Sequence, residues 1–212
     1  KNRKKHFSGF PTESIRECLN IAKIKDLEVT DIAFNTRPLS NIISKGVFFL
    51  KNYNLKNYNS ISRYRKKLNI KSYLSKDFKF KKNIKIHYIE HHLAHIASAY
   101  FPSNYKDAIG LSIDGSGDFV TLAIAKCHNH NIKITEKVFF PNSLGIFYHA
   151  MTQFLGFKNY GDEYKIMGMA AYGEPKYFNK IKDNLFKLNK DENFELNLHY
   201  FNHQKSNFKY VA

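Results

Sequence analysis

Cysteine is scarce in this chain of 212 residues, tryptophan is absent, and no long apolar run occurs. The two cysteines, Cys18 and Cys127, lie far apart without a CxxC partner, which excludes a disulfide framework and a thiolate zinc site. The apolar segments fall short of the 18 or so residues that a membrane helix needs. The first ten residues, KNRKKHFSGF, also lack the apolar segment of a secretory signal. We therefore expect a folded cytoplasmic chain, and we interpret it as a fragment because it begins with lysine.

Positive charge is abundant but unevenly distributed along the chain. The formal net charge is +16, a value typical of proteins that bind nucleic acid. Residues 37–86 hold fourteen Lys and Arg against one acid, whereas residues 87–170 hold six basic and seven acidic groups. We interpret residues 37–83 as a solvated basic insertion. The alternative is a polyanion-binding patch, in which the interleaved tyrosines would suit single-stranded nucleic acid.

Apolar periodicity predicts a mixture of short strands and amphipathic helices. The mixture, with strands in antiparallel runs, favours α/β or α+β layering. The predicted elements are a helix over 12–24, strands over 29–36 and 84–90, a helix from His91 or His92, an antiparallel segment over 107–141 with D-G-S-G as its first turn, a helix capped by Ser143, a helix over 176–188 and a strand within FELNLHYF.

The segment EHHLAHIASAYFP places three histidines directly at the start of the predicted helix. His91 and His95 are four residues apart, so their imidazoles project from one helix face and could bind one metal ion, while His92 points elsewhere. Two histidines make an incomplete metal site and need a carboxylate. The alternative is that the pair is a surface or core feature without a ligand.

The motif IDGSGD supplies that carboxylate. Asp114 is predicted to end its strand, and Gly115 and Gly117 would leave the backbone bare enough for a phosphate or a metal-bound ligand to approach. The alternative is a glycine hairpin turn in which the aspartate serves only the turn. A helix with two histidines followed by this motif predicts a site where nucleotide phosphate and cation meet.

The segment GDEYKIMGMAAYG combines glycines, an acidic pair, one lysine and small residues. Lys165 could bind a phosphate as a point charge, and Gly168 with its small neighbours would allow a ligand to approach the backbone. A tight junction between packed helices would use the same small residues. The methionines Met151, Met167 and Met169 are predicted to fill the core.

Taken together and in this order, RKKHFSGFPTESIRECL, EHHLAHIASAYFPS, IDGSGD, FPNSLGIFYHAMTQFLGF and GDEYKIMGMAAYGEP resemble the amino-terminal domain of carbamoyltransferases of the nodulation and antibiotic-tailoring family. The resemblance covers nearly all of residues 1–212 except the basic stretch. It implies an incomplete actin, Hsp70 and sugar-kinase type fold, that is, a ribonuclease H-like mixed sheet with flanking helices, in its Kae-one-like version. A YrdC-like domain, absent from this chain, would follow.

The resemblance also implies a reaction and its participants. Carbamoyl phosphate and ATP would give an enzyme-bound carbamoyladenylate in the YrdC-like domain, and the carbamoyl group would pass to a hydroxyl of a sugar or natural product. The matching positions imply that His91, His95 and Asp114 bind Fe2+ or Zn2+, with Asp114 and His91 at the catalytic centre. On the nucleotide side the matches are Gly115, Gly117 and Lys165, and less closely Lys5 with His6.

The sequence departs from the family pattern at several places. Asp118 stands where the family has glutamate, and GMAAYG replaces GLAPYG. An upstream His-Asp-Ser phosphate motif and a downstream metal-binding aspartate are missing, so we expect the fragment alone to be inactive. Two alternatives to carbamoyl transfer remain: a tRNA threonylcarbamoyladenosine-type transferase of the same fold, to which the basic stretch would bring RNA, and a truncated remnant without catalysis.

Overall fold

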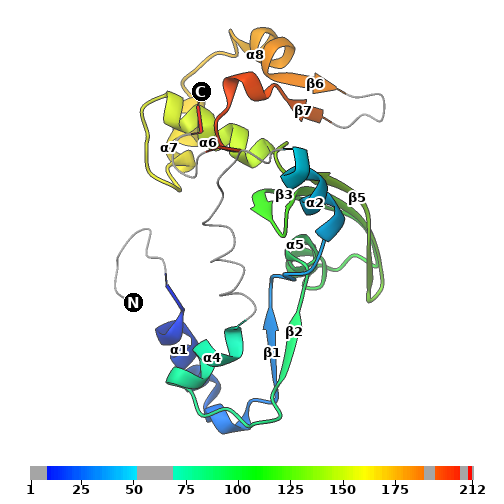
Figure 1. The fold of residues 1–212 in the computed structure, drawn as a ribbon, viewed down its shortest axis with the longest axis vertical. Helices are drawn as coiled ribbons and strands as arrows, with labels where there is room; N and C mark the ends of the chain where they lie inside the picture. The colour runs from blue at the N-terminus through cyan, green and yellow to red at the C-terminus, as the bar shows by residue number, and fades with distance from the viewer. Residues whose placement is uncertain (1–8, 52–68, 189–193, 206–209, 212) are drawn as a thin grey trace. The chain divides into compact units, whose positions relative to one another are not determined.

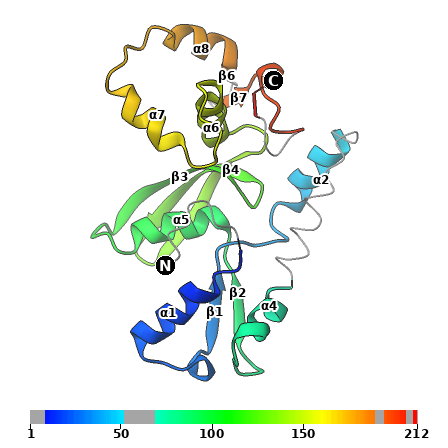
Figure 2. The same cartoon turned by 90° about the vertical axis from the view of Figure 1, so that its left-hand side faces the viewer.

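The computed structural model describes residues 9–51, 69–188, 194–205 and 210–211. The described residues form both helices and strands, so the mixed α/β class expected from the sequence is confirmed. Figures 1 and 2 show the elements in two views. The chain divides into two compact units, of which unit 1 comprises Lys1–Ser40 and Lys56–Glu90, and unit 2 comprises Asn41–Leu55 and His91–Ala212.

Unit 1 is built on a parallel pair of short strands. Ile32 in β1 lies opposite Ile86 in β2, and the predicted strands over 29–36 and 84–90 are thereby confirmed. Two helices contact each other in this unit, where the Thr12 hydroxyl donates a hydrogen bond to the Asp77 carboxylate at 2.9 Å. The bounds of these elements are α1 Thr12–Ala22, η1 Asp26–Glu28, β1 Asp31–Phe34, α4 Ile70–Asp77 and β2 Lys85–Tyr88.

Unit 2 contains an antiparallel sheet in the order β3-β4-β5, with helix α5 packed on one face. Small residues of β4, such as Ala123 and Ala125, leave room for Ile96 of α5. A methyl group at Gly110 of β3 would lie 2.5 Å from Ile96, so the helix approaches the strand as closely as glycine permits. The bounds are α2 Ile42–Lys51, α5 His91–Tyr100, β3 Asp107–Gly117, β4 Val120–His128 and β5 Asn131–Phe139.

The other face of this sheet is apolar along strand β3. Ile109, Leu111 and Ile113 are 68%, 59% and 50% exposed, because they alternate with the residues that face α5. Their cross-strand neighbours in β4 include Ile124 and Leu122. The sheet is therefore covered by α5 on one side and presents aliphatic side chains on the other.

The first turn of the sheet lies four residues later than the sequence predicted. Strand β3 does not end at Asp114 but continues to Gly117, which pairs with Val120. The regular ladder is interrupted between Ile113 and Gly117, so Asp114 lies at an irregularity within the strand. The turn itself is Asp118 and Phe119, both with positive φ angles of 52° and 74°, as two-residue hairpin turns require.

Helix α6 (Leu144–Phe154) begins where the sequence predicted. The hydroxyl of Ser143 accepts a hydrogen bond from the Ile146 N–H at 3.0 Å, and it lies 2.8 Å from the Gly115 carbonyl oxygen, to which it can donate. A methyl group on Gly145 would lie 2.6 Å from backbone atoms of Asp114 and Gly115. The start of α6 therefore packs directly on the irregular part of β3.

Replacing Ser143 by alanine should test this junction. We expect Ser143→Ala to lower the free energy of unfolding by about 1 to 2 kcal/mol, because the cap of α6 and the bond to β3 are lost together. Urea unfolding measures the change. The control is Ser98→Ala, which removes an exposed hydroxyl bonded only within its helix to the His95 carbonyl; a similar loss in both variants would contradict a special role for Ser143.

The remaining elements of unit 2 follow α6 in the chain. The predicted helix over 176–188 is shorter, because its last residues form a strand that pairs with Phe194–Leu196. The predicted strand in FELNLHYF is confirmed for that segment. A second apolar cluster contains Ala150, Leu196 and Phe201. The bounds are α7 Glu163–Ala170, α8 Phe178–Leu185, β6 Phe186–Leu188, β7 Phe194–Leu196 and η2 Leu198–Tyr200.

Helix α7 is more exposed than its methionines suggested. Met167 and Met169 are 67% and 55% exposed, so the prediction that they fill the core is wrong. The helix contacts α6 instead through its first residue, where Glu163 bonds to His149 and its carbonyl accepts from Tyr148. Among the described residues, none of the helices combines the length and apolarity that crossing a bilayer demands.

Candidate metal centre

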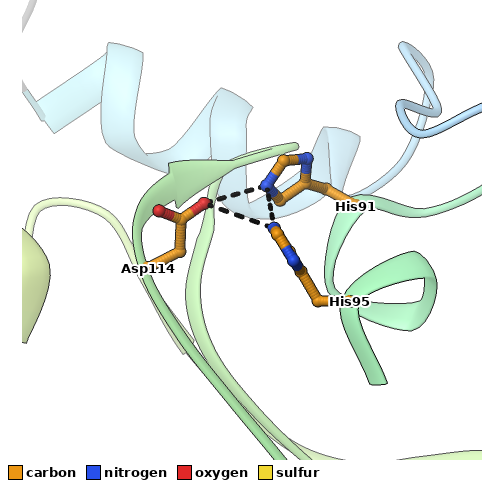
Figure 3. A group of neighbouring side chains, drawn as sticks. All are labelled: His91, His95 and Asp114. Carbon is orange, nitrogen blue, oxygen red and sulfur yellow. Dashed lines mark hydrogen bonds and ion pairs between the residues drawn. The ribbon is translucent and has the colours of Figure 1, made fainter. Parts of the chain in front are cut away.

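Three side chains from α5 and β3 converge in unit 2, as Figure 3 shows: His91, His95 and Asp114. The Nε2 atom of His91 lies 2.8 Å from Asp114 Oδ2 and 2.9 Å from His95 Nε2. His95 Nε2 lies 3.9 Å from the same carboxylate oxygen. Within the described part of the chain, this is the single group of three or more His, Cys, Asp or Glu side chains with such spacing.

The donor set fits a divalent cation. Atoms that bind one ion at about 2.1 Å with tetrahedral or octahedral angles lie about 3 to 3.4 Å apart. Two of the three observed separations, 2.8 Å and 2.9 Å, are near this range, and the third is longer at 3.9 Å. The two Nε2 atoms face each other, so one of them carries a proton in the metal-free protein, and a cation would take the place of that proton.

The carboxylate of Asp114 is held in its ionised form. A hydrogen bond from His91, opposed by partial burial and assisted by the Gly115 N–H, lowers the pKa of Asp114 to about 2. The Gly115 N–H donates to Oδ1 at 2.6 Å, which leaves Oδ2 for the histidines. Because the pKa is lowered in the folded state, these hydrogen bonds are present at neutral pH and are lost only as the pH falls toward 2.

His92 fixes the orientation of α5 on the sheet. It is fully buried, its Nε2 lies 2.9 Å from the Val120 carbonyl and its Nδ1 lies 2.8 Å from the Ser112 hydroxyl. Burial lowers the pKa of His92, so the neutral ring donates from Nε2 and accepts at Nδ1. His92 is thus bonded to two strands, and its neighbours His91 and His95 face Asp114.

The two glycines after Asp114 have different surroundings. A methyl group on Gly117 would overlap the Cγ and Cδ2 atoms of the His91 ring, whereas one on Gly115 would have no neighbour within 4 Å. The close approach that the sequence indicated at Gly117 is therefore made by the imidazole of His91. At Gly115 the space is open.

A family model described as Carbamoyltransferase N-terminus matches residues 1–209. The chain belongs to this family. The resemblance inferred from the five motifs is thereby confirmed, and it places the cluster of His91, His95 and Asp114 in a carbamoyltransferase amino-terminal domain.

Several longer proteins are similar to this carbamoyltransferase domain. An uncharacterized protein of Synechocystis is 37% identical over 95% of the chain and 34% of its own length. The nodulation protein NolNO of Sinorhizobium fredii is 28% identical over 88% of the chain and 27% of its own length. The nodulation protein NolO of Bradyrhizobium diazoefficiens is 35% identical over 47% of the chain and 18% of its own length. The chain thus spans about a third or less of the curated relatives it matches.

The remaining residues predicted on the nucleotide side are Lys165 and, less closely, Lys5 with His6. Lys165 of α7 forms an ion pair with Asp162 at 2.8 Å and lies 5.4 Å from the ring centre of Phe157. The pair lowers the pKa of Asp162 and raises that of Lys165, so the lysine is charged and already held by a carboxylate. Lys5 and His6 lie outside the described residues, as does the 52–68 part of the basic insertion.

The sequence predicted the capping role of Ser143 but no role at this cluster for His92, Gly145 or Asp118. The side chain of His92 joins α5 to β3, Ser143 and Gly145 join α6 to β3, and Asp118 contacts the first residue of α5. For Ser143 the signal was its position before an apolar helix. The contacts of the other residues join segments distant in sequence, and a single sequence does not show them.

Proposed function

We propose that this chain is the part of an O-carbamoyltransferase that binds the acceptor. The enzyme would transfer a carbamoyl group from carbamoyl phosphate, by way of an ATP-derived carbamoyladenylate, to a hydroxyl of a sugar or natural product. Membership of the carbamoyltransferase family supports the reaction type. The observation that carries the proposal is the convergence of two imidazole nitrogens and one ionised carboxylate on a single point.

In this proposal His91, His95 and Asp114 hold Fe2+ or Zn2+. The bound ion would polarise the carbamoyl oxygen or lower the pKa of the acceptor hydroxyl. Three protein ligands leave coordination positions open for substrate, as catalytic sites require. The chain contributes orientation: Asp114 stays ionised at neutral pH, and the buried bonds of His92 keep the helix in register with the strand.

On the nucleotide side we propose Gly115, Gly117, Lys165 and Lys5 as the residues nearest the adenylate. The open space at Gly115 supports a close approach by phosphate there. Gly117 already contacts His91, so its part would be indirect. Lys165 would have to exchange its bond to Asp162 for a phosphate oxygen, which its flexible side chain permits.

We further propose that the fold is the ribonuclease H-like type of the actin, Hsp70 and sugar-kinase superfamily, with residues 1–212 as part of one domain, a basic insertion at 37–83 and a YrdC-like partner domain. The order of a parallel strand pair, a helix and an antiparallel three-stranded sheet is consistent with such a fold.

The test is a combined metal and transfer assay on the protein that contains this chain. We expect one Fe2+ or Zn2+ per chain by elemental analysis, and transfer of radiolabelled carbamoyl from carbamoyl phosphate, dependent on ATP, to members of a panel of hydroxyl-bearing sugars and antibiotics. His95→Ala should lower both metal content and transfer, the latter by about 100-fold or more.

The matched control for that test is His128→Ala. His128 is also an exposed histidine bonded to an aspartate, Asp107, in the same sheet. Its partner Asp107 is the first residue of β3, whereas Asp114 lies later in that strand. We expect this variant to keep metal and transfer. If His95→Ala retains both, the site assignment is wrong, and if the intact protein shows no transfer dependent on carbamoyl phosphate, the proposed reaction is wrong.

The tRNA threonylcarbamoyladenosine-type reaction stays a second candidate because of the basic stretch over 37–86. Phosphate contacts would give a steep fall of log affinity with log salt concentration. A tRNA-binding titration at several salt concentrations therefore separates the two reactions.

A further inference from the structure

We propose that Asp118 is a positioning residue that fixes His91 for cation binding. This inference rests on the metal centre of the proposed function. The carboxylate Oδ2 of Asp118 accepts a hydrogen bond from the backbone N–H of His91 at 3.1 Å. His91 is the first residue of α5, so the same contact fixes the start of the helix and the backbone of the residue whose ring meets Asp114.

The chemistry of a helix start favours this contact. Backbone N–H groups in the first turn of a helix have no partner within the helix, and the helix dipole makes that end partly positive. A carboxylate therefore binds there strongly. Asp118 is only 9% exposed, which strengthens the hydrogen bond because little water competes with it.

The turn that carries Asp118 is itself anchored. The side-chain amide of Asn41 donates to the Asp118 carbonyl at 3.0 Å. The next residue, Phe119, packs its ring against Phe48 of α2 and Phe140, with ring centres 5.6 Å and 5.8 Å away. Asp118 thus links this anchored turn to the first residue of α5 through a hydrogen bond.

One hairpin consequently holds His91 at three points. Asp114 contacts its Nε2 atom, Gly117 lies against its ring, and Asp118 binds its backbone N–H. Asp114 supplies a proposed metal ligand, while Asp118 sets where the second ligand sits relative to it. Without Asp118, the first turn of α5 could move away from β3, and the distance between the two ligands would no longer be set.

The competing explanation is that Asp118 only stabilises the fold as a helix cap. The two explanations differ in what a matched substitution does. Asn129 also has a left-handed backbone, with φ of 51° against 52° for Asp118, and also lies in a turn of the same sheet. Asn129→Ala therefore carries the same backbone strain at a position away from His91.

The experiment compares Asp118→Ala, Asp118→Asn and Asn129→Ala by Zn2+ titration and by thermal unfolding without metal. We expect Asp118→Ala to weaken Zn2+ binding by roughly 10-fold or more. Asp118→Asn keeps an oxygen acceptor and a residue type that tolerates positive φ, so its affinity should recover to within about threefold of the original. Asn129→Ala should lower the unfolding temperature by less than Asp118→Ala, because Asn129 is exposed whereas the Asp118 carboxylate bonds the start of α5, and it should leave Zn2+ affinity unchanged.

Amide hydrogen exchange at His91 gives a readout without metal. Protection of this N–H should be lost in Asp118→Ala and kept in Asp118→Asn and Asn129→Ala. Equal Zn2+ affinity in Asp118→Ala and Asn129→Ala, or an Asp118→Asn variant as weak as Asp118→Ala, would overturn the positioning role. If the unaltered protein binds no Zn2+ or Fe2+, the metal centre is wrong, and unchanged exchange at His91 in Asp118→Ala would separately refute the contact.

Discussion

Gly117→Ala is expected to abolish the arrangement of the metal centre while leaving most of the fold intact. The added methyl group would overlap the ring of His91 and lie 2.6 Å from its Nε2 atom. The side chain of His91 is 21% exposed, so the ring can rotate toward solvent instead of displacing the strand. We expect the free energy of unfolding to fall by about 1 to 3 kcal/mol, and Zn2+ affinity to fall by roughly 100-fold because one of three ligands is lost.

Gly115→Ala is the matched control, since it adds the same methyl group two residues earlier where no atom lies within 4 Å. Its stability and Zn2+ affinity should match those of the original protein. If nucleotide phosphate approaches Gly115 as proposed, the added methyl group should weaken binding of AMP or ATP even though Zn2+ affinity is unchanged. A Gly117→Ala protein with normal Zn2+ affinity, measured by competition with a chromophoric chelator, would show that the His91 ring does not take part.

Asp114→Asn is expected to remove cation binding without removing the side-chain shape. The neutral amide keeps one oxygen but loses the negative charge, which at neutral pH is present because the pKa of Asp114 is about 2. Two imidazoles and an amide are a poor donor set for Zn2+ or Fe2+. We expect the Zn2+ dissociation constant to rise by at least about 100-fold, as measured by calorimetric titration.

The control for this substitution lies on the same strand. Asp107 of β3 also bonds a histidine, His128, through a carboxylate oxygen, and Asp107→Asn makes the same chemical change in an exposed pair. This variant should bind Zn2+ normally. Equal weakening in both variants would indicate a general effect of charge, and normal binding in Asp114→Asn would contradict its role as a ligand.

Much of the secondary structure could be predicted because its causes are local. The helix over Thr12–Ala22, the strands β1 and β2, and the helix start at His91 follow from apolar spacing within a few residues. The prediction of the first sheet turn failed at D-G-S-G, where glycines usually indicate a turn. The chain instead turns at Asp118 and Phe119, since the strand continues past an irregularity that pairing with β4 stabilises.

The sequence by itself determined the kinds of donor and their local spacing. His91 and His95 share a helix face because four residues make about one turn, and Asp114 follows in an order of motifs that identifies the family. Composition likewise excluded disulfides and thiolate metal sites.

Only the tertiary structure decided that these donors meet. The distance between α5 and β3 depends on contacts between residues far apart in sequence: Ile96 against Gly110, and the buried ring of His92 between Ser112 and Val120. It also decided that Gly117 accommodates an imidazole and that Asp118 binds the first N–H of the helix. Such contacts arise from the packing of a helix on a sheet, and no local pattern of residue types encodes that packing.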